Sequence, residues 1–271
     1  MVKLTINEQQ VSVPEGMTIM EAAEKVGVHI PHLCYLKDIN EIGACRVCLV
    51  ELKGMEKLVT ACNTICEDGM EILTNSPRVR RTRRINVELI LSDHNTNCAS
   101  CIKSGNCTLQ SLANDFNMRG EHYPTKLRRE AVDYSTPLIR ENDKCVKCMR
   151  CIQICENVQT VKIWDLLGTG SRATVDASRN RRIQDTECTY CGQCITHCPT
   201  AALRERDDTG IVFDAIDDPN TVTVVQVAPA VRAAWAEQFN LSPEFATPKR
   251  MAAALRELGF NYVFDTDFAA D

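Results

Sequence analysis

Two runs of closely spaced cysteines constrain this chain more than any other feature. Each run has the spacing C-x-x-C-x-x-C-x-x-x-C, the first over residues 145–155 and the second over residues 188–198. Gaps of two residues let three thiolates converge on one site, and the fourth cysteine, on the following helix, then points toward a second site. The eight residues are Cys145, Cys148, Cys151, Cys155, Cys188, Cys191, Cys194 and Cys198.

This spacing resembles that of bacterial two-cluster ferredoxins, in which the last cysteine of each run ligates the cluster of the other run. The second run ends in Cys198-Pro199, as in those proteins, whereas the first ends in Cys155-Glu156 and loses no ligand by this departure. Structural zinc sites also use C-x-x-C pairs, but two complete runs favour clusters. The predicted ligands are Cys145, Cys148, Cys151 and Cys198 for one [4Fe–4S] cluster, and Cys188, Cys191, Cys194 and Cys155 for another.

Composition narrows the class of protein further. A chain of 271 residues has room for two or more domains, and it is much longer than a small disulfide-stabilised scaffold. The formal net charge of -5 gives no indication of nucleic acid or of an anionic membrane as a partner. The N-terminus has no apolar signal core, and no apolar run approaches the length of a membrane span. We therefore expect a cytoplasmic protein, without membrane insertion, whose 16 cysteines act mainly as thiolate ligands.

Residues 1–75 have the pattern of a small mixed α/β domain. Alternating apolar residues over 2–6 and 11–13 predict a hairpin. Thr18 and Glu21 form a capping-box sequence that predicts the start of a helix. Four cysteines follow, Cys34, Cys45, Cys48 and Cys62, with further strands expected within residues 46–52, 58–59 and 70–73.

The spacing of these four cysteines suits a [2Fe–2S] cluster, because a central C-x-x-C loop supplies two ligands and distant cysteines close the site. It differs from the plant-type spacing. The segment that carries these cysteines resembles the [2Fe–2S] domain of [FeFe]-hydrogenases, a domain that is also found in the electron-input subunit of respiratory complex I. The resemblance lies in residues 31–34 (PHLC), 43–48 (GACRVC), 61–64 (ACNT) and 68–70 (DGM). Cys66 fits no cluster, and we predict a buried free thiol there.

A helix is predicted from Pro77 to about Ser92, with a strongly basic first half. A nucleic-acid patch is one interpretation of five arginines, but at this net charge a solvated face or a dock for an acidic partner is favoured. The arginines are Arg78, Arg80, Arg81, Arg83 and Arg84.

One histidine and three cysteines follow that helix, with the spacing H-x3-C-x2-C-x5-C. Neutral imidazole is a competent metal ligand, and zinc with the same four ligands is the alternative. A [4Fe–4S] motif with one His and three Cys ligands, directly after such a [2Fe–2S] domain, resembles the same hydrogenase and complex I subunits. We expect His94→Cys to keep this cluster and lower its potential. The predicted ligands are His94, Cys98, Cys101 and Cys107, and the other histidines, His29, His32, His122 and His197, are expected to be structural.

The middle of the chain gives no nucleotide-binding motif. Residues 108–143 predict a short helix and then a connector, and residues 161–182 form an insertion with strand-like pieces near Trp164 and residues 173–175. No strand–G-x-G-x-x-G–helix unit or G-x-x-x-x-G-K-[ST] sequence is present. We therefore expect no nucleotide or flavin site in this chain.

Residues 219–271 predict a βαβ fragment. The expected elements are a buried-type strand over 221–227, a turn over 228–230, helices over 231–239 and 248–258, and a strand over 262–264. Such a fragment is too small to bury its own sheet face, so we expect a partner to cover it. Residues 227–232 (VAPAVR) and 264–271 (FDTDFAAD) resemble the opening of the catalytic domain of [FeFe]-hydrogenases.

The expected fold is α+β and multidomain: a β-grasp [2Fe–2S] domain over 1–77, a small helical [4Fe–4S] domain over 78–137, a two-cluster ferredoxin domain over 138–210 and the βαβ segment over 219–271. Fifteen of the 16 cysteines are then assigned, and none but Cys66 remains for a hydrogen-activating iron site. We therefore expect no hydrogen production by this polypeptide.

Two functional hypotheses follow from the resemblance. The chain is similar to the truncated hydrogenase-like subunit of electron-bifurcating transhydrogenases, which implies electron transfer between flavin- and NAD(P)-binding subunits and ferredoxin. Alternatively, it is the N-terminal part of an [FeFe]-hydrogenase subunit. A molybdenum or tungsten formate dehydrogenase is a weaker alternative, which the segments at 227–232 and 264–271 disfavour.

Overall fold

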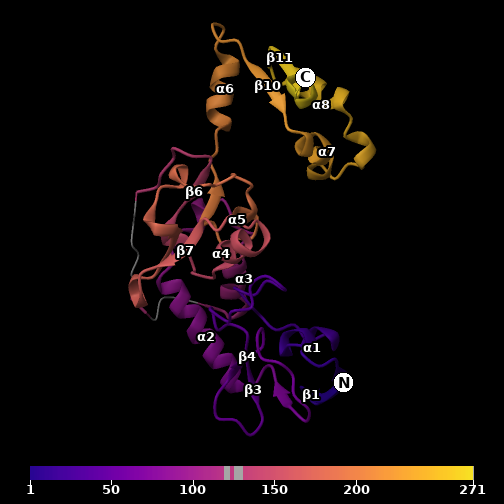
Figure 1. Ribbon diagram of the computed structural model, residues 1–271, viewed down its shortest axis with the longest axis vertical. Helices are drawn as coiled ribbons and strands as arrows, with labels where there is room; N and C mark the ends of the chain where they lie inside the picture. The colour runs from indigo at the N-terminus through magenta and orange to yellow at the C-terminus, as the bar shows by residue number, and fades with distance from the viewer. Residues whose placement is uncertain (119–122, 125–130, 271) are drawn as a thin grey trace. The chain divides into compact units, whose positions relative to one another are not determined.

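The computed structural model describes residues 1–118, 123–124 and 131–270 of the chain (Figure 1). It consists of two compact units, Met1–Arg206 and Asp207–Asp271. His122, expected to be structural, lies outside the described residues. No helix in the described part of the chain has the length and apolar character needed to cross a membrane.

A five-stranded sheet with the order β2-β1-β5-β3-β4 begins the first unit. The predicted hairpin is present, and β1 also pairs in parallel with β5. Along β1 the side chains of Val2, Leu4 and Ile6 are buried and that of Lys3 is exposed, as the alternating pattern requires. The strands are β1 (Val2–Ile6), β2 (Gln9–Val13), β3 (Leu49–Leu52), β4 (Val59–Thr60) and β5 (Glu71–Leu73).

The helix α1 (Ile19–Lys25) covers this core and begins with the predicted capping box. The Thr18 hydroxyl accepts a hydrogen bond from the Glu21 amide, and the Glu21 carboxylate accepts one from the Thr18 amide. Cys66 is 3% exposed and packs in the same core, as predicted for a buried thiol.

The helix α2 (Pro77–Ser92) begins and ends where the sequence predicts, and it lies against β3 (Figure 1). The Ser76 hydroxyl caps it by accepting a hydrogen bond from the Val79 amide. A short 3₁₀ turn, η1 (Cys98–Ser100), and the predicted helix α3 (Thr108–Asp115) follow. Leu109 and Leu112 of α3 pack against Val87 of α2.

Short elements build the rest of the first unit around two antiparallel strand pairs. The two strands of the insertion, β7 and β8, were predicted, whereas their antiparallel pairing and the β6–β9 pair were not. The elements are β6 (Leu138–Arg140), η2 (Asn142–Lys144), α4 (Arg150–Gln153), a π-helical turn η3 (Ile154–Val158), β7 (Trp164–Leu167), η4 (Gly170–Arg172), β8 (Thr174–Ala177), η5 (Ser178–Asn180), η6 (Ile183–Asp185), α5 (Gln193–Thr196) and β9 (Leu203–Glu205).

The second unit contains the predicted βαβ arrangement, with β10 and β11 parallel. The predicted turn at 228–230 is wrong, because Pro229 begins α7, where proline fits the first helical turn. The strand predicted over 221–227 is present as β10, but it is not buried in this unit, since Val224 is 60% exposed. The elements are α6 (Thr209–Asp217), β10 (Val224–Val227), α7 (Pro229–Gln238), η7 (Pro243–Phe245), α8 (Pro248–Glu257), β11 (Tyr262–Asp265) and α9 (Thr266–Ala270).

Candidate iron–sulfur sites

The first four cysteines come together beside the sheet of the first unit. Cys34, Cys48 and Cys62 are almost fully buried, and Cys45 is half-buried. Arg46, between the central pair, has a φ of 57°, a left-handed conformation that is uncommon for a residue with a side chain. Strained backbone of this kind is often found where a loop forms a binding site.

Contacts between the sulfur atoms tie these cysteines into two pairs. A hydrogen bond from Cys34, with help from the Val47 amide, lowers the pKa of Cys45 to about 6, and the same contact raises the pKa of Cys34. The contact between Cys48 and Cys62 likewise lowers the pKa of Cys48 and raises that of Cys62. The four sulfurs therefore form one donor set, in which a thiolate, the form that binds metal, is already favoured.

His94 directly follows the last turn of α2 and lies in the wall of a cavity of about 350 Å³, which Cys98 and Cys107 also line. The imidazole is buried, its Nδ1 has no hydrogen-bond partner among the described residues, and burial lowers its pKa. Cys101 is half-buried at the end of η1, and its charge acts on Cys98. A buried nitrogen without a partner calls for an explanation, and a neutral imidazole beside cysteines fits a metal ligand.

The eight cysteines of the twin runs line two separate cavities. The last cysteine of each run lies with the other run, which is the grouping that the spacing predicts. The first cavity is lined by Cys145, Cys148, Cys151 and Cys198, and the second by Cys155, Cys188, Cys191 and Cys194.

The two runs share one backbone geometry. Lys147 and Tyr190 occupy the same position in their runs, and both have a φ of 52°. The amide of Lys147 donates to the sulfur of Cys145, and that of Tyr190 donates to the sulfur of Cys188. Met149 and Gly192, each two positions later in its run, also have matching left-handed conformations.

Burial opposes free thiolates in both cavities. It raises the pKa of Cys148 and of Cys194 to about 12, and raises that of Cys151 well above its ordinary value. The indole N–H of Trp164 donates to the sulfur of Cys194 and partly offsets this effect. Sets of four sulfurs that are mostly buried suit a bound iron cluster, because metal binding releases the protons and supplies positive charge. Among the described residues, no three His, Cys, Asp or Glu side chains are grouped closely enough to hold a single metal ion.

Buried polar side chains connect the first cysteine site to the twin runs. Asn40 is fully buried, and its Nδ2 donates to the carbonyls of Cys34 at 2.7 Å and of Cys148 at 2.9 Å. Arg150 donates to the Tyr35 carbonyl at 2.7 Å. Sequence reasoning missed Asn40 and Arg150, because no spacing pattern marks a contact across more than 100 residues.

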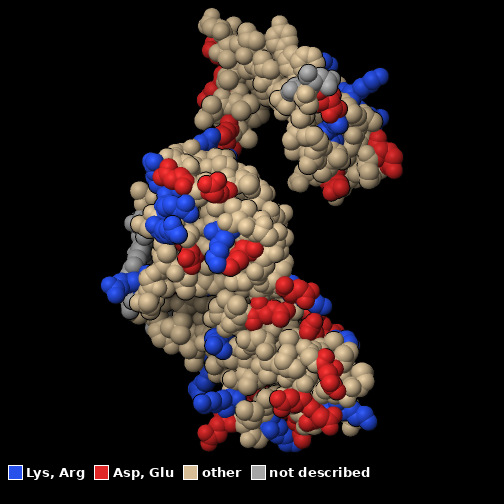
Figure 2. Space-filling view, viewed as in Figure 1, with Lys and Arg blue, Asp and Glu red and all other residues tan. Residues whose placement is uncertain are grey.

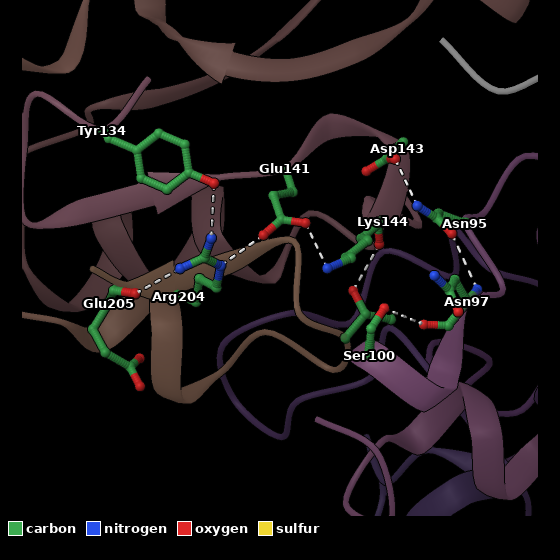
Figure 3. Close-up of polar contacts among 10 residues, drawn as sticks. Asn95, Asn97, Ser100, Tyr134, Glu141, Asp143, Lys144, Arg204 and Glu205 are labelled. Carbon is green, nitrogen blue, oxygen red and sulfur yellow. Dashed lines mark hydrogen bonds and ion pairs between the residues drawn. The ribbon is translucent and has the colours of Figure 1, made fainter. Parts of the chain in front are cut away.

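The histidine site is connected to the twin runs as well. Lys103 donates to the Cys198 carbonyl, and the Thr108 amide donates to the Pro199 carbonyl at 3.2 Å. Figure 3 shows the polar contacts around η2. Within them, Glu141 pairs with Lys144 and Arg204, and Asn95 donates to Asp143.

Comparison with known families divides the chain into four matched regions. Residues 1–77 match a 2Fe-2S iron-sulfur cluster binding domain, and residues 83–122 match the NADH-ubiquinone oxidoreductase-G iron-sulfur binding region. Residues 144–202 match a 4Fe-4S dicluster domain, and residues 221–271 match the C-terminal domain of the iron only hydrogenase large subunit.

Individual relatives agree with this division. The NADP-reducing hydrogenase subunit HndD of Solidesulfovibrio fructosivorans is 44% identical over 277 residues, which cover 100% of this chain and 47% of HndD. The chain therefore spans about half the length of that relative. The NAD-reducing hydrogenase HoxS subunit gamma of Cupriavidus necator is 31% identical over 209 residues, covering 76% of this chain and 87% of the subunit.

A solved structure shows the same relationship. A chain of an NAD⁺-reducing [NiFe]-hydrogenase in the H₂-reduced state superposes with a TM-score of 0.70 and 28% identity, over 76% of this chain and 87% of that one. The chain therefore belongs to the family of iron–sulfur subunits that hydrogenases and NADH-quinone oxidoreductases share, and it carries that family's 2Fe-2S and 4Fe-4S domains.

Proposed function

We propose that this chain is an electron-transfer subunit of a flavin-containing NAD(P)-linked oxidoreductase complex and holds one [2Fe–2S] and three [4Fe–4S] clusters. The observation that carries the proposal is the grouping of the cysteines, above all the exchange of Cys155 and Cys198 between the twin runs. This exchange is the arrangement of a two-cluster ferredoxin site.

The proposed ligands follow the four groups of side chains. The first [4Fe–4S] cluster is bound through one histidine, which reduces the negative charge of the site relative to four thiolates. The sets are Cys34, Cys45, Cys48 and Cys62 for [2Fe–2S]; His94, Cys98, Cys101 and Cys107; Cys145, Cys148, Cys151 and Cys198; and Cys155, Cys188, Cys191 and Cys194.

The side chains do no acid–base or nucleophilic work in this mechanism. Each bound cluster would carry one electron at a time, and the protein sets the reduction potential of each cluster through ligand type, burial and hydrogen bonds to sulfur. The Ile163 amide donates to the Cys155 sulfur at 3.3 Å, and Trp164 donates to that of Cys194. Asn40 and Lys103 hold the first two sites against the peptide groups of Cys148 and Cys198, which favours electron exchange between neighbouring sites.

The names of the relatives suggest the partners. HndD belongs to an NADP-reducing hydrogenase and HoxS gamma to an NAD-reducing one. We infer that flavin- and NAD(P)-binding subunits exchange electrons with this chain and that ferredoxin is a further partner. In this proposal the complex is a transhydrogenase that splits electron flow at a flavin on another subunit.

A second candidate is the cluster-relay part of an [FeFe]-hydrogenase subunit. The match of residues 221–271 to the hydrogenase C-terminal domain and the 44% identity to HndD along the whole chain favour it. The two candidates share the same cluster relay and differ in the enzyme that the relay serves.

An assay of the native complex, purified without oxygen, separates the two candidates. The complex is supplied with reduced ferredoxin and NADH, and hydrogen is measured alongside NADP reduction. NADP reduction without hydrogen supports the transhydrogenase, whereas hydrogen production supports the hydrogenase. Neither product, in a complex that retains all its iron, would contradict both.

A further inference from the structure

An arginine occupies a position in α2 where an apolar residue is expected. Val79, Arg83 and Val87 recur every four residues and are the buried residues of the helix, the spacing of a core-facing stripe. The side chain of Arg83 is only 4% exposed. The other arginines of this helix are exposed or half-exposed: Arg78, Arg80, Arg81 and Arg84.

The contacts of Arg83 lead to the [2Fe–2S] site. Its Nε and Nη2 both donate to the carbonyl of Leu49, at 3.0 and 2.6 Å, and Leu49 directly follows Cys48. Among the described residues, no carboxylate forms an ion pair with Arg83, and Cys48 is the charged group that acts on it. Burial lowers the pKa of Arg83 to about 10, so the guanidinium stays protonated at neutral pH.

A buried cation without an anionic partner is costly, and a neutral donor would satisfy the Leu49 carbonyl equally well. The position therefore calls for a positive charge, and among the described residues the negative charge that acts on it is that of Cys48. A [2Fe–2S] cluster with four thiolates gains one further negative charge when it is reduced. A cation held nearby in a low-dielectric interior stabilises the reduced form more than the oxidised form.

We propose that Arg83 is a positioning residue that raises the reduction potential of the [2Fe–2S] cluster bound by Cys34, Cys45, Cys48 and Cys62. This inference rests on the proposed ligand set. As a consequence, the reduced form of this cluster is more stable than it would be with the four cysteine ligands and no nearby cation.

The test is a redox titration of the [2Fe–2S] signal, followed by electron paramagnetic resonance, on variants of the native complex. Arg83→Gln keeps a donor for Leu49 and removes the charge, and Arg83→Met is a second neutral variant. Arg83→Lys keeps the charge. Arg81→Gln removes an exposed charge from the same helix and serves as the matched control, because solvent and salt screen that position.

Both neutral variants should lower the potential, changing the ratio of oxidised to reduced cluster at a fixed potential by about tenfold, or about 59 mV for one electron. Arg83→Lys and Arg81→Gln should stay close to the wild type. A wild-type potential in the neutral variants overturns the inference. It is also overturned if the neutral variants bind no iron while Arg83→Lys does, since the role would then be structural. A wild-type complex without a [2Fe–2S] signal would instead contradict the proposed function.

Discussion

Two regions of the first unit bring cysteines together in different ways. In residues 1–77 the four cysteines are irregularly spaced and lie beside a five-stranded sheet, whose core is mostly aliphatic and includes two of them, Cys48 and Cys62. In residues 138–206 the cysteines recur at fixed short spacings, and the strands form only two separate pairs. The buried core of this second region includes the cysteines themselves, among them Cys151, Cys155, Cys194 and Cys198.

The difference shows which ligands are positioned by neighbouring residues in the sequence and which by the tertiary fold. In the twin runs Lys147 and Tyr190 have the same left-handed conformation beside the ligands, so short spacing predicts the first three ligands of each run, and the exchange of the fourth was predicted from the resemblance to two-cluster ferredoxins. In the first region the sheet brings together Cys34, which precedes β3 and β4 in the sequence, and Cys62, which follows them. We therefore infer that residues 1–77 fold without a bound cluster and position its ligands, whereas residues 138–206 need bound clusters to keep their fold.

Removal of iron is the strongest test of this contrast. Isolated two-stranded pairs are marginally stable, so we expect residues 138–206 to lose most of their amide protection in the iron-free chain. Residues 1–77 should retain protection in β1, β3 and β5. Hydrogen exchange of the chain with and without iron measures both regions in one sample. An equal loss in the two regions would break the comparison.

Replacement of one exchanged cysteine tests whether the twin runs share ligands. Cys198→Ser should abolish the [4Fe–4S] cluster assigned to Cys145, Cys148 and Cys151 and leave the [2Fe–2S] signal unchanged. Cys66→Ser is the matched control, because Cys66 is equally buried but lies outside the proposed ligand sets. Iron content and electron paramagnetic resonance report the outcome. If Cys198→Ser retained every cluster, the predicted exchange would be wrong.

Asn40 joins the two regions, and its removal should destabilise both. In Asn40→Ala the Cys148 carbonyl loses its donor, at about 1–3 kcal/mol for an unsatisfied buried group. The Cys34 carbonyl loses one hydrogen bond, worth about 1 kcal/mol, and keeps the one from Arg150 Nε at 3.2 Å. We expect a loss of about 2–4 kcal/mol in the free energy of unfolding of the iron-bound chain, measured with denaturant. Asn157→Ala, which removes an exposed contact with the Ile39 carbonyl at 3.4 Å, should change it by less than about 0.5 kcal/mol. Equal effects of the two variants would show that Asn40 has no special role.

The sequence predicted the elements that local signals determine. The capping box at Thr18 and the serine–proline start of α2 are read from a few adjacent residues, and both are present. The alternation in β1 and the presence of strands in the insertion, β7 and β8, were also predicted correctly.

Features that depend on distant partners were missed. The β6–β9 pair joins residues about 65 positions apart and has only three residues in each strand. The bridge at Asn40 spans 108 residues. In the second unit the helix α6 (Thr209–Asp217) was missed as well. The interior position of Arg83 was not predicted either, since composition suggested one basic face for all five arginines.

The smallest expected effect concerns a single hydrogen bond to sulfur in the twin runs. Trp164 is 2% exposed, and its indole donates to the sulfur of Cys194, whereas the amide of Ile163 donates to that of Cys155. Trp164→Phe removes the side-chain donor and keeps a ring in the core, and the amide bond of Ile163 is unaffected. One such hydrogen bond contributes about 1 kcal/mol, and it favours the more negative, reduced cluster. We therefore expect a modest fall in the reduction potential of the cluster assigned to Cys194. The potential of the [2Fe–2S] cluster should not change, because its site lies in residues 1–77. Redox titration of both signals measures the two potentials together. A shift of the same size in both would mean that the variant loosens the whole unit, and that the two regions are less independent than their cores suggest.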